Sequence, residues 1–191
     1  AQIIDESGRG TFRQVASLLR EGGAALAAAH HAGVIHRDVK PQNFFRAEVA
    51  GGRRFKLFDF GLARSTALDA PGITKLGMVV GTPAYMSPEQ ARGVAVDERS
   101  DLYSFAVVAY EALVGDPLVK SFDLGRIMVE ILIEIPPPPS RAVPILPAEV
   151  DRLFEAALAK DRERRPSRVV DWAESVASCL DTLPDDLTGW T

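Results

Sequence analysis

Residues 36–43, His-Arg-Asp-Val-Lys-Pro-Gln-Asn, place two cationic side chains, a carboxylate and two amides within one short segment. Two tripeptides follow in order, Asp-Phe-Gly at residues 59–61 and Ser-Pro-Glu at residues 87–89. Each motif is weak alone, because aspartates such as Asp38 and Asp59 are ordinarily turn or capping residues. All three in this order and spacing rarely arise by chance, so together they form a specific hypothesis about chemistry.

The ordered set resembles the catalytic loop, the metal-binding turn and the activation-segment end of protein kinases. Residues 81–90, Gly-Thr-Pro-Ala-Tyr-Met-Ser-Pro-Glu-Gln, are similar to bacterial serine/threonine kinases in particular, and the resemblance runs from about Thr11 to Leu180. It implies a mainly α fold: the C-terminal lobe of a protein-kinase-like fold, with a short β-hairpin that carries the catalytic and metal motifs. We expect residues 1–180 to form this partial kinase domain and residues 181–191 to form an acidic tail or linker.

The resemblance also implies an activity, the ATP-dependent phosphorylation of serine or threonine in a protein substrate, with ATP and Mg2+ as cofactors. Asp38 would accept or orient the proton of the substrate hydroxyl. Lys40 would offset the charge on the phosphate being transferred. Asn43 and Asp59 would supply oxygen ligands, which suit a hard cation such as Mg2+. Phe45 would lie near the adenine.

Other residues are assigned roles around this centre by the same resemblance. Lys40 and Thr82 are typical of serine/threonine kinases, and Thr82 is expected to contact Asp38; the alternative is a loop threonine that caps locally. Gly61 would let the backbone turn beside the metal. His36 and Phe60 are expected to stack, which makes His36 a packing residue.

Three further residues are expected to support the loop and the segment end. Asp101 would accept amide protons of the catalytic loop, and it can also be a helix N-cap. Glu89 would pair with Arg165; a buried pair costs about 3–5 kcal/mol to break, whereas a solvated pair is worth less than about 1 kcal/mol.

Thr74 is predicted to be the main activating phosphorylation site of the complete kinase. Its phosphate would be received by Arg37 through charge-assisted hydrogen bonds. The alternative is that Thr74 is a solvated loop residue.

Periodicity and caps predict where the helices lie. Thr11 and Gln14 form a capping box for a first helix that Gly33 ends, and Gly22 and Gly23 either weaken that helix or admit another backbone. His30 and His31 are interpreted as helix-end residues. Further elements are predicted as a strand over 54–60, a long loop over 62–86, and helices from Ser100 or Asp101 to Leu113 and over 124–133, 150–159 and 167–180.

Four consecutive prolines, residues 136–139, must end the helix before them. They favour a rigid connection between helices, and the alternative is a polyproline II ligand for a partner domain.

Composition excludes several classes of protein. Hydrophobic residues make up 47% of the 191 residues and charged residues 25%, which is typical of a globular domain. The net charge of −4 gives no reason to expect a nucleic-acid partner, and a single cysteine, Cys179, allows no internal disulfide. The longest apolar run, 102–114, is too short for a membrane segment. We expect a cytoplasmic location, with any membrane tether of the parent protein outside this chain.

A complete kinase domain also has a strand-rich N-terminal lobe with a glycine-rich phosphate flap and a strand lysine. Residues 8–10, Gly-Arg-Gly, lack the third glycine, so we expect that lobe to be absent here and to be the partner of this chain in the parent protein. The isolated chain should then be inactive, with an exposed apolar face that includes Phe44 and Phe45. The alternatives are a non-catalytic binding or scaffold module and a small-molecule phosphotransferase; the full activation segment favours a protein substrate.

Overall fold

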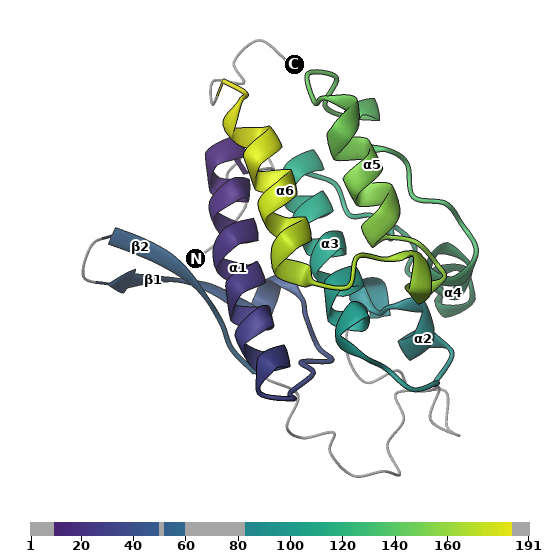
Figure 1. Ribbon diagram of the computed structural model, residues 1–191. Coiled ribbons are helices and arrows are strands. Elements are labelled where there is room, and N and C mark those ends of the chain that lie inside the picture. Colours follow the sequence, from purple (N-terminus) through teal and green to yellow (C-terminus); the bar gives the residue numbers. More distant parts are fainter. Residues whose placement is uncertain (1–9, 50–51, 60–82, 185–191) are drawn as a thin grey trace.

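A computed structural model describes residues 10–49, 52–59 and 83–184. Within these ranges the fold is mainly α, as the sequence predicts, with one antiparallel hairpin that projects from the helices (Figure 1). The helices are α1 (Phe12–His31), α2 (Pro88–Ala91), α3 (Glu98–Val114), α4 (Leu124–Leu132), α5 (Ala148–Ala157) and α6 (Val169–Asp181), and the strands are β1 (Phe44–Val49) and β2 (Gly52–Leu57). Short 3-10 turns at Pro41–Asn43, Pro83–Tyr85, Pro139–Arg141 and Arg162–Arg164 connect them.

Helix α1 begins at the predicted capping box. The Thr11 hydroxyl accepts the N–H of Gln14 at 3.2 Å, and the Gln14 side chain accepts the N–H of Thr11 at 2.9 Å. The chain leaves the helix through Gly33, whose φ of +73° favours glycine. The capping box and the helix end therefore lie where the sequence predicts them.

The glycine pair in α1 makes room for its neighbours. A Cβ atom on Gly22 would lie 2.7 Å from the Phe105 ring and 2.9 Å from the Phe44 ring. A Cβ on Gly23 would lie 2.8 Å from the Cβ of Ala173 in α6. Gly23 thus admits the backbone of α6, one of the two roles that the sequence allowed, whereas Gly22 makes room for aromatic side chains.

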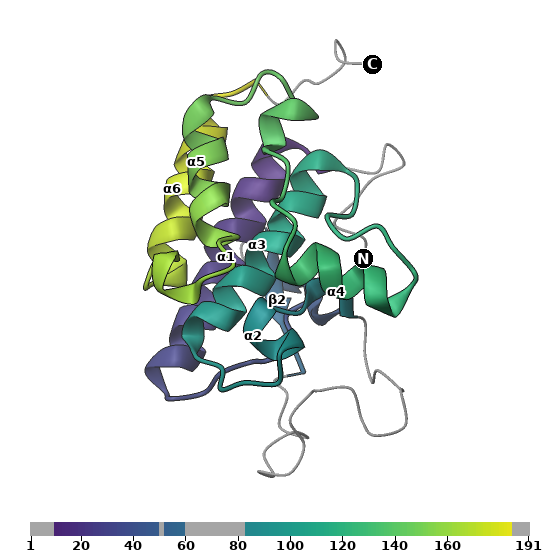
Figure 2. The same cartoon turned by 90° about the vertical axis from the view of Figure 1, so that its right-hand side faces the viewer.

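Helix α1 packs along α6, with α3 behind both and α5 beside α6 and α3 (Figures 1 and 2). A series of aromatic rings links these helices through the core, with ring centroids 5.5 to 6.1 Å apart. The rings follow the order Phe44, Phe105, Trp172, Phe154 and Tyr110. All five side chains are buried, so the hairpin, α3, α5 and α6 share one hydrophobic core.

The hairpin is anchored to α3 at the start of β1 and to α1 in the middle of β2. Glu21 of α1 accepts the backbone N–H of Phe55 at 2.5 Å. Phe44 stacks on Phe105 and is 3% exposed, so its predicted place on an exposed apolar face is wrong. Successive strand residues face opposite sides, and Phe45 is 46% exposed, with its ring edge-to-face against the equally exposed Phe58.

Several predicted boundaries shift by a few residues. Helix α3 begins at Glu98, because Asp97 caps it by accepting the N–H of Arg99 at 2.9 Å; Asp101 is therefore not its N-cap. Strand β2 ends at Leu57. In the part of the chain that the structure describes, no helix is long and apolar enough to cross a membrane.

Candidate active site

The segment after α1 folds back on itself around Asp38. The ammonium of Lys40 lies 2.7 Å from Oδ2 of Asp38. The 3-10 turn at residues 41–43 brings Asn43 back to the same residue, where its amide donates to the Asp38 carbonyl oxygen at 2.8 Å. Asp38 keeps 37% of its side chain exposed, so a proton acceptor faces solvent beside a cation and an amide.

Asp59 reaches this region from the other strand of the hairpin. Phe44 pairs with Leu57, and the N–H of Phe58 donates to the carbonyl of Asn43 at 2.9 Å. Asp59 follows directly, with a left-handed φ of +55° that aspartate tolerates better than most residues. The pairing thus places the exposed Asp59 at the same end of the hairpin as Asn43.

Asp101 of α3 holds the backbone of the segment 36–43. Its Oδ2 accepts the N–H of His36 and its Oδ1 accepts the N–H of Arg37, both at 2.8 Å. Arg37 has a left-handed φ of +65°, a conformation that costs free energy and persists only where its surroundings fix it. The carboxylate is 1% exposed and gives these two amides the contacts that the sequence analysis expected of it.

His30 also contacts Asp101, which the sequence analysis missed. Its Nε2 lies 2.8 Å from Oδ2 of Asp101, and its side chain is 6% exposed. The neighbouring His31 is exposed, so only one of the two histidines is the plain helix-end residue that was expected. The partner lies 71 positions away in the chain, and no local pattern links the two.

His36 is more than a packing residue. Its Nδ1 accepts the N–H of Asp38 at 3.3 Å, so Nε2 carries the proton and donates to the carbonyl oxygen of Phe58 at 3.0 Å. The side chain is fully buried. His36 therefore joins the catalytic segment to the strand end that precedes Asp59.

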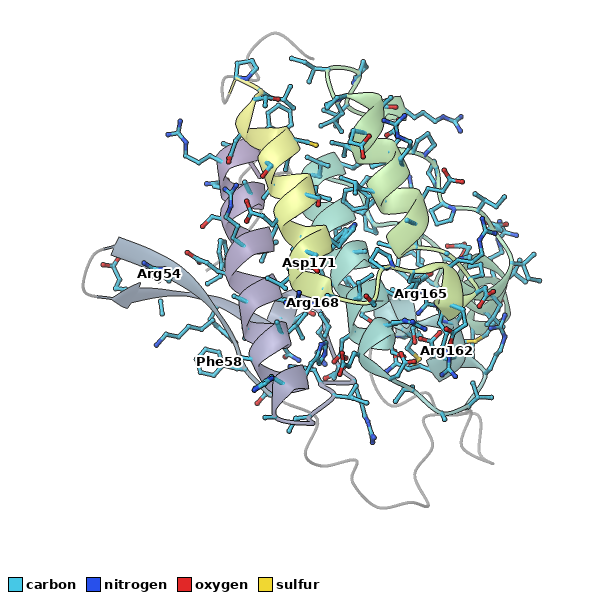
Figure 3. The ribbon with its side chains drawn as sticks, viewed as in Figure 1. Arg54, Phe58, Arg162, Arg165, Arg168 and Asp171 are labelled. Atoms are coloured by element: carbon cyan, nitrogen blue, oxygen red, sulfur yellow. The ribbon has the colours of Figure 1, made fainter. Side chains whose placement is uncertain are left out.

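Glu89 and Arg165 form a buried bidentate pair. The guanidinium meets the two carboxylate oxygens at 2.7 and 2.9 Å, and Ser100 donates to the same carboxylate at 2.5 Å. Burial acts to raise the pKa of Glu89, but the bonds from Arg165 and Ser100 outweigh it and leave the pKa lowered. Figure 3 shows Arg165 within the helical body, in contrast to Phe58 beneath the hairpin.

Residues 1–178 of this chain match the family model described as "Protein kinase domain". The chain belongs to the protein kinase domain family. Among curated relatives it is 40% identical over 174 residues to the serine/threonine-protein kinase pkn2 of Myxococcus xanthus, an alignment that covers 87% of this chain and 20% of that protein. It is 45% identical over 141 residues to a probable serine/threonine-protein kinase PknB of Bifidobacterium longum, covering 74% of this chain and 20% of that protein.

Solved structures agree with this assignment. The kinase domain of Mycobacterium tuberculosis PknI superimposes with a TM-score of 0.66 at 26% identity, covering 90% of this chain and 57% of that chain. The fold is thus a protein-kinase fold dominated by its helical lobe. The chain spans about a fifth to a quarter of the length of the curated relatives that it matches, from 20% to 27%.

Four predicted site residues lie outside the described part of this kinase chain: Phe60, Gly61, Thr74 and Thr82. Two described residues that the sequence analysis did not single out make partly buried polar contacts. Tyr85 donates to Glu111 of α3 at 2.7 Å, and burial together with this bond raises the pKa of Tyr85. Lys160 donates to the carbonyl oxygen of Glu130 at 3.0 Å, and burial lowers the pKa of Lys160 to about 8.

Proposed function

We propose that the protein carrying this chain transfers a phosphoryl group from ATP to serine or threonine of a protein substrate. The observation that supports this most directly is the convergence of Lys40 and Asn43 on Asp38, in a loop whose backbone is held by Asp101. Phosphoryl transfer depends mainly on positioning and charge neutralisation, which is what such a group of side chains supplies. The kinase relatives agree with this class of reaction.

Within the proposed reaction, Asp38 orients the acceptor hydroxyl and takes its proton. Its exposed carboxylate can meet a substrate, while the backbone around it is fixed. The ammonium of Lys40 lies 2.7 Å from that carboxylate and would offset the charge on the phosphate being transferred. A positioned base of this kind contributes about 10²–10⁴-fold to the rate.

Asn43 and Asp59 fit a magnesium ion. The Asn43 amide uses its nitrogen on Asp38, and among the described residues no group donates to its oxygen. That oxygen and the exposed carboxylate of Asp59 form an oxygen-only set, and Mg2+ usually takes one or two protein carboxylates and completes its shell with phosphates and water. When bound, Mg2+ would neutralise charge on the phosphates of ATP.

The exposed edge of the hairpin is the proposed adenine side. Phe45 and Phe58 are each 46% exposed and lie edge-to-face at 5.4 Å. An apolar pair of this kind suits one face of a flat base. We propose that the 191-residue chain alone binds ATP weakly, because it corresponds to 57% of a solved kinase domain.

Recognition and regulation complete the proposal. Thr82 would frame the acceptor site, and Thr74 would be the activating phosphorylation site, with Arg37 receiving its phosphate. Arg37 presents an exposed side chain next to Asp38, which suits that role. The second candidate function is a non-catalytic binding module, which the exposed Phe45 and Phe58 favour because such aromatic surface commonly meets a partner.

The deciding experiment measures phosphate transfer by the full-length protein with ATP, Mg2+ and a generic protein acceptor. Asp38→Asn and Asp59→Asn should each lower kcat by about 10²-fold or more. Asp171→Asn is the matched control, because Asp171 lies on the surface of α6 and its carboxylate pairs only with Arg168 among the described residues. Retained transfer in Asp38→Asn would contradict the kinase assignment and favour the binding module.

A further inference from the structure

Gln90 uses both ends of its side-chain amide although it is only 4% exposed. Its Oε1 accepts the N–H of Ser87 at 2.9 Å, which is one half of the capping box of α2. Its Nε2 donates to the carbonyl oxygen of Arg37 at 2.7 Å. One side chain thus joins the end of the activation segment to the catalytic loop.

The first of these bonds is ordinary, and the second is not. Helix α1 carries the same kind of box, in which Gln14 accepts the N–H of Thr11 at 2.9 Å. Among the described residues, the nitrogen of the Gln14 amide donates no hydrogen bond. Capping therefore accounts for the bond that the oxygen of Gln90 accepts. It does not account for the bond that the nitrogen donates to Arg37.

The bond to Arg37 completes a set of restraints on a strained residue. Arg37 has a φ of +65°, and its N–H is held by Asp101 of α3. Its carbonyl is held by Gln90 of α2, so two different helices fix the two polar backbone groups of one residue. That carbonyl belongs to the same planar peptide group as the N–H of Asp38, which in turn donates to His36.

We propose that Gln90 is a positioning residue for Asp38, acting through the peptide bond between Arg37 and Asp38. Movement of the activation-segment end then changes the orientation of that peptide bond and, with it, the position of the Asp38 carboxylate. The kinetic part of this proposal rests on the proposed kinase function, whereas the structural part does not.

Gln90→Glu separates the two bonds. A carboxylate still accepts the N–H of Ser87 but cannot donate to the Arg37 carbonyl. Gln14→Glu is the matched control, since it makes the same change in a capping box that does not contact the loop. Gln90→Met, which removes both bonds with little change in volume, serves if a carboxylate beside Glu89 prevents folding.

The first measurement is the amide 15N chemical shift of Asp38 in the 191-residue chain, because that nitrogen shares its peptide group with the Arg37 carbonyl. We expect the shift to move in Gln90→Glu and Gln90→Met and to stay unchanged in Gln14→Glu. An unmoved Asp38 signal in a folded Gln90 variant, or an equal movement in Gln14→Glu, would overturn the proposal.

The second measurement is the kinetics of the full-length protein. We expect kcat to fall about 10- to 100-fold in the Gln90 variants while the KM for ATP stays unchanged, since small misplacement of a reacting group is costly. Unchanged kcat would overturn the link to the catalytic residue. If the unaltered protein transfers no phosphate, the proposed function fails, and the Asp38 signal still decides the structural part.

Discussion

Arg165 meets Glu89 across 76 positions of sequence, with its guanidinium 2.7 and 2.9 Å from the two carboxylate oxygens. The side chains are 0% and 5% exposed. Arg165 also donates to the carbonyl oxygens of Ala159 and Arg99 and lies 4.8 Å from the centre of the Tyr103 ring. Its charge is therefore fully surrounded, and the segment end that carries Glu89 is tied to the C-terminal part of the chain.

Breaking this pair from one side should be costly. We expect Glu89→Gln and Arg165→Met each to lower the free energy of unfolding by about 3–5 kcal/mol, because the remaining group is left without its partner. The double variant should lose less than the sum of the two. Urea unfolding measures all three; Arg168→Met, in the exposed pair with Asp171, is the control and should cost less than about 1 kcal/mol. Strict additivity would show that the pair is not coupled.

The lowered pKa of Lys160 should make the free energy of unfolding depend on pH. Its pKa is about 8 in the folded chain because of burial, below about 10.4 in an unfolded chain. Between these values the unfolded state binds more protons, so stability should rise with pH through this window. Lys160→Met should lack this rise.

The measurement for Lys160 is the midpoint of thermal unfolding from pH 7 to pH 10.5. The exposed Lys120, which pairs with Asp116, provides the control: Lys120→Met should keep the rise. A rise that survives in Lys160→Met would assign it to another group.

Gly22→Ala tests the packing of α1. Helix propensity alone predicts that alanine stabilises a helix interior by about 0.5–1 kcal/mol relative to glycine. The structure predicts the opposite sign, since the new Cβ would lie 2.7 Å from the Phe105 ring, and overpacking costs about 1–3 kcal/mol. Denaturant unfolding gives the sign directly, and Gly22→Ala combined with Phe105→Leu should recover part of the loss. A stabilised single variant would contradict the packing.

His30→Leu tests the contact with Asp101 that the sequence did not reveal. Losing a hydrogen bond to a buried carboxylate should cost about 1.5–3 kcal/mol of unfolding free energy. His31→Leu is an adjacent control at an exposed site and should change stability by less than about 0.5 kcal/mol. Equal effects of the two substitutions would show that the contact with Asp101 is not responsible.

The sequence predicts best where the cause is local. The capping box at Thr11, the helix end at Gly33 and the helical periods between them depend on neighbouring residues, and all lie as expected. The sequence analysis expects this helix to begin at Ser100 or Asp101, two or three residues after the observed start of α3 at Glu98. Asp101 turns its carboxylate to the catalytic loop instead, and Asp97 caps the helix.

The sequence predicts least where a contact joins distant segments. His30 and Gln90 meet Asp101 and Arg37 across 71 and 53 positions. No periodicity or cap encodes such a pair. Phe44 is expected with Phe45 on the face that an N-terminal lobe would cover, but strand alternation turns Phe44 inward, into the space that Gly22 leaves. The resemblance to kinases points to the proposed site residues. The residues that hold them in place, such as His30 and Gln90, are identified only by their contacts in the structure.

The contact between α1 and α6 has a consequence for how the chain is made. The first helix of the described part packs along the last (Figure 1). Trp172 of α6 lies between the rings of Phe105 and Phe154 in the core. During synthesis α1 emerges from the ribosome long before α6, so the side of α1 that packs on α6 stays uncovered until Leu180 follows. Because domains fold as units while the chain is elongated at about 5–20 residues per second, this interval spans many seconds. A stop codon placed before residue 169 should therefore leave nascent chains that are held by chaperones or degraded.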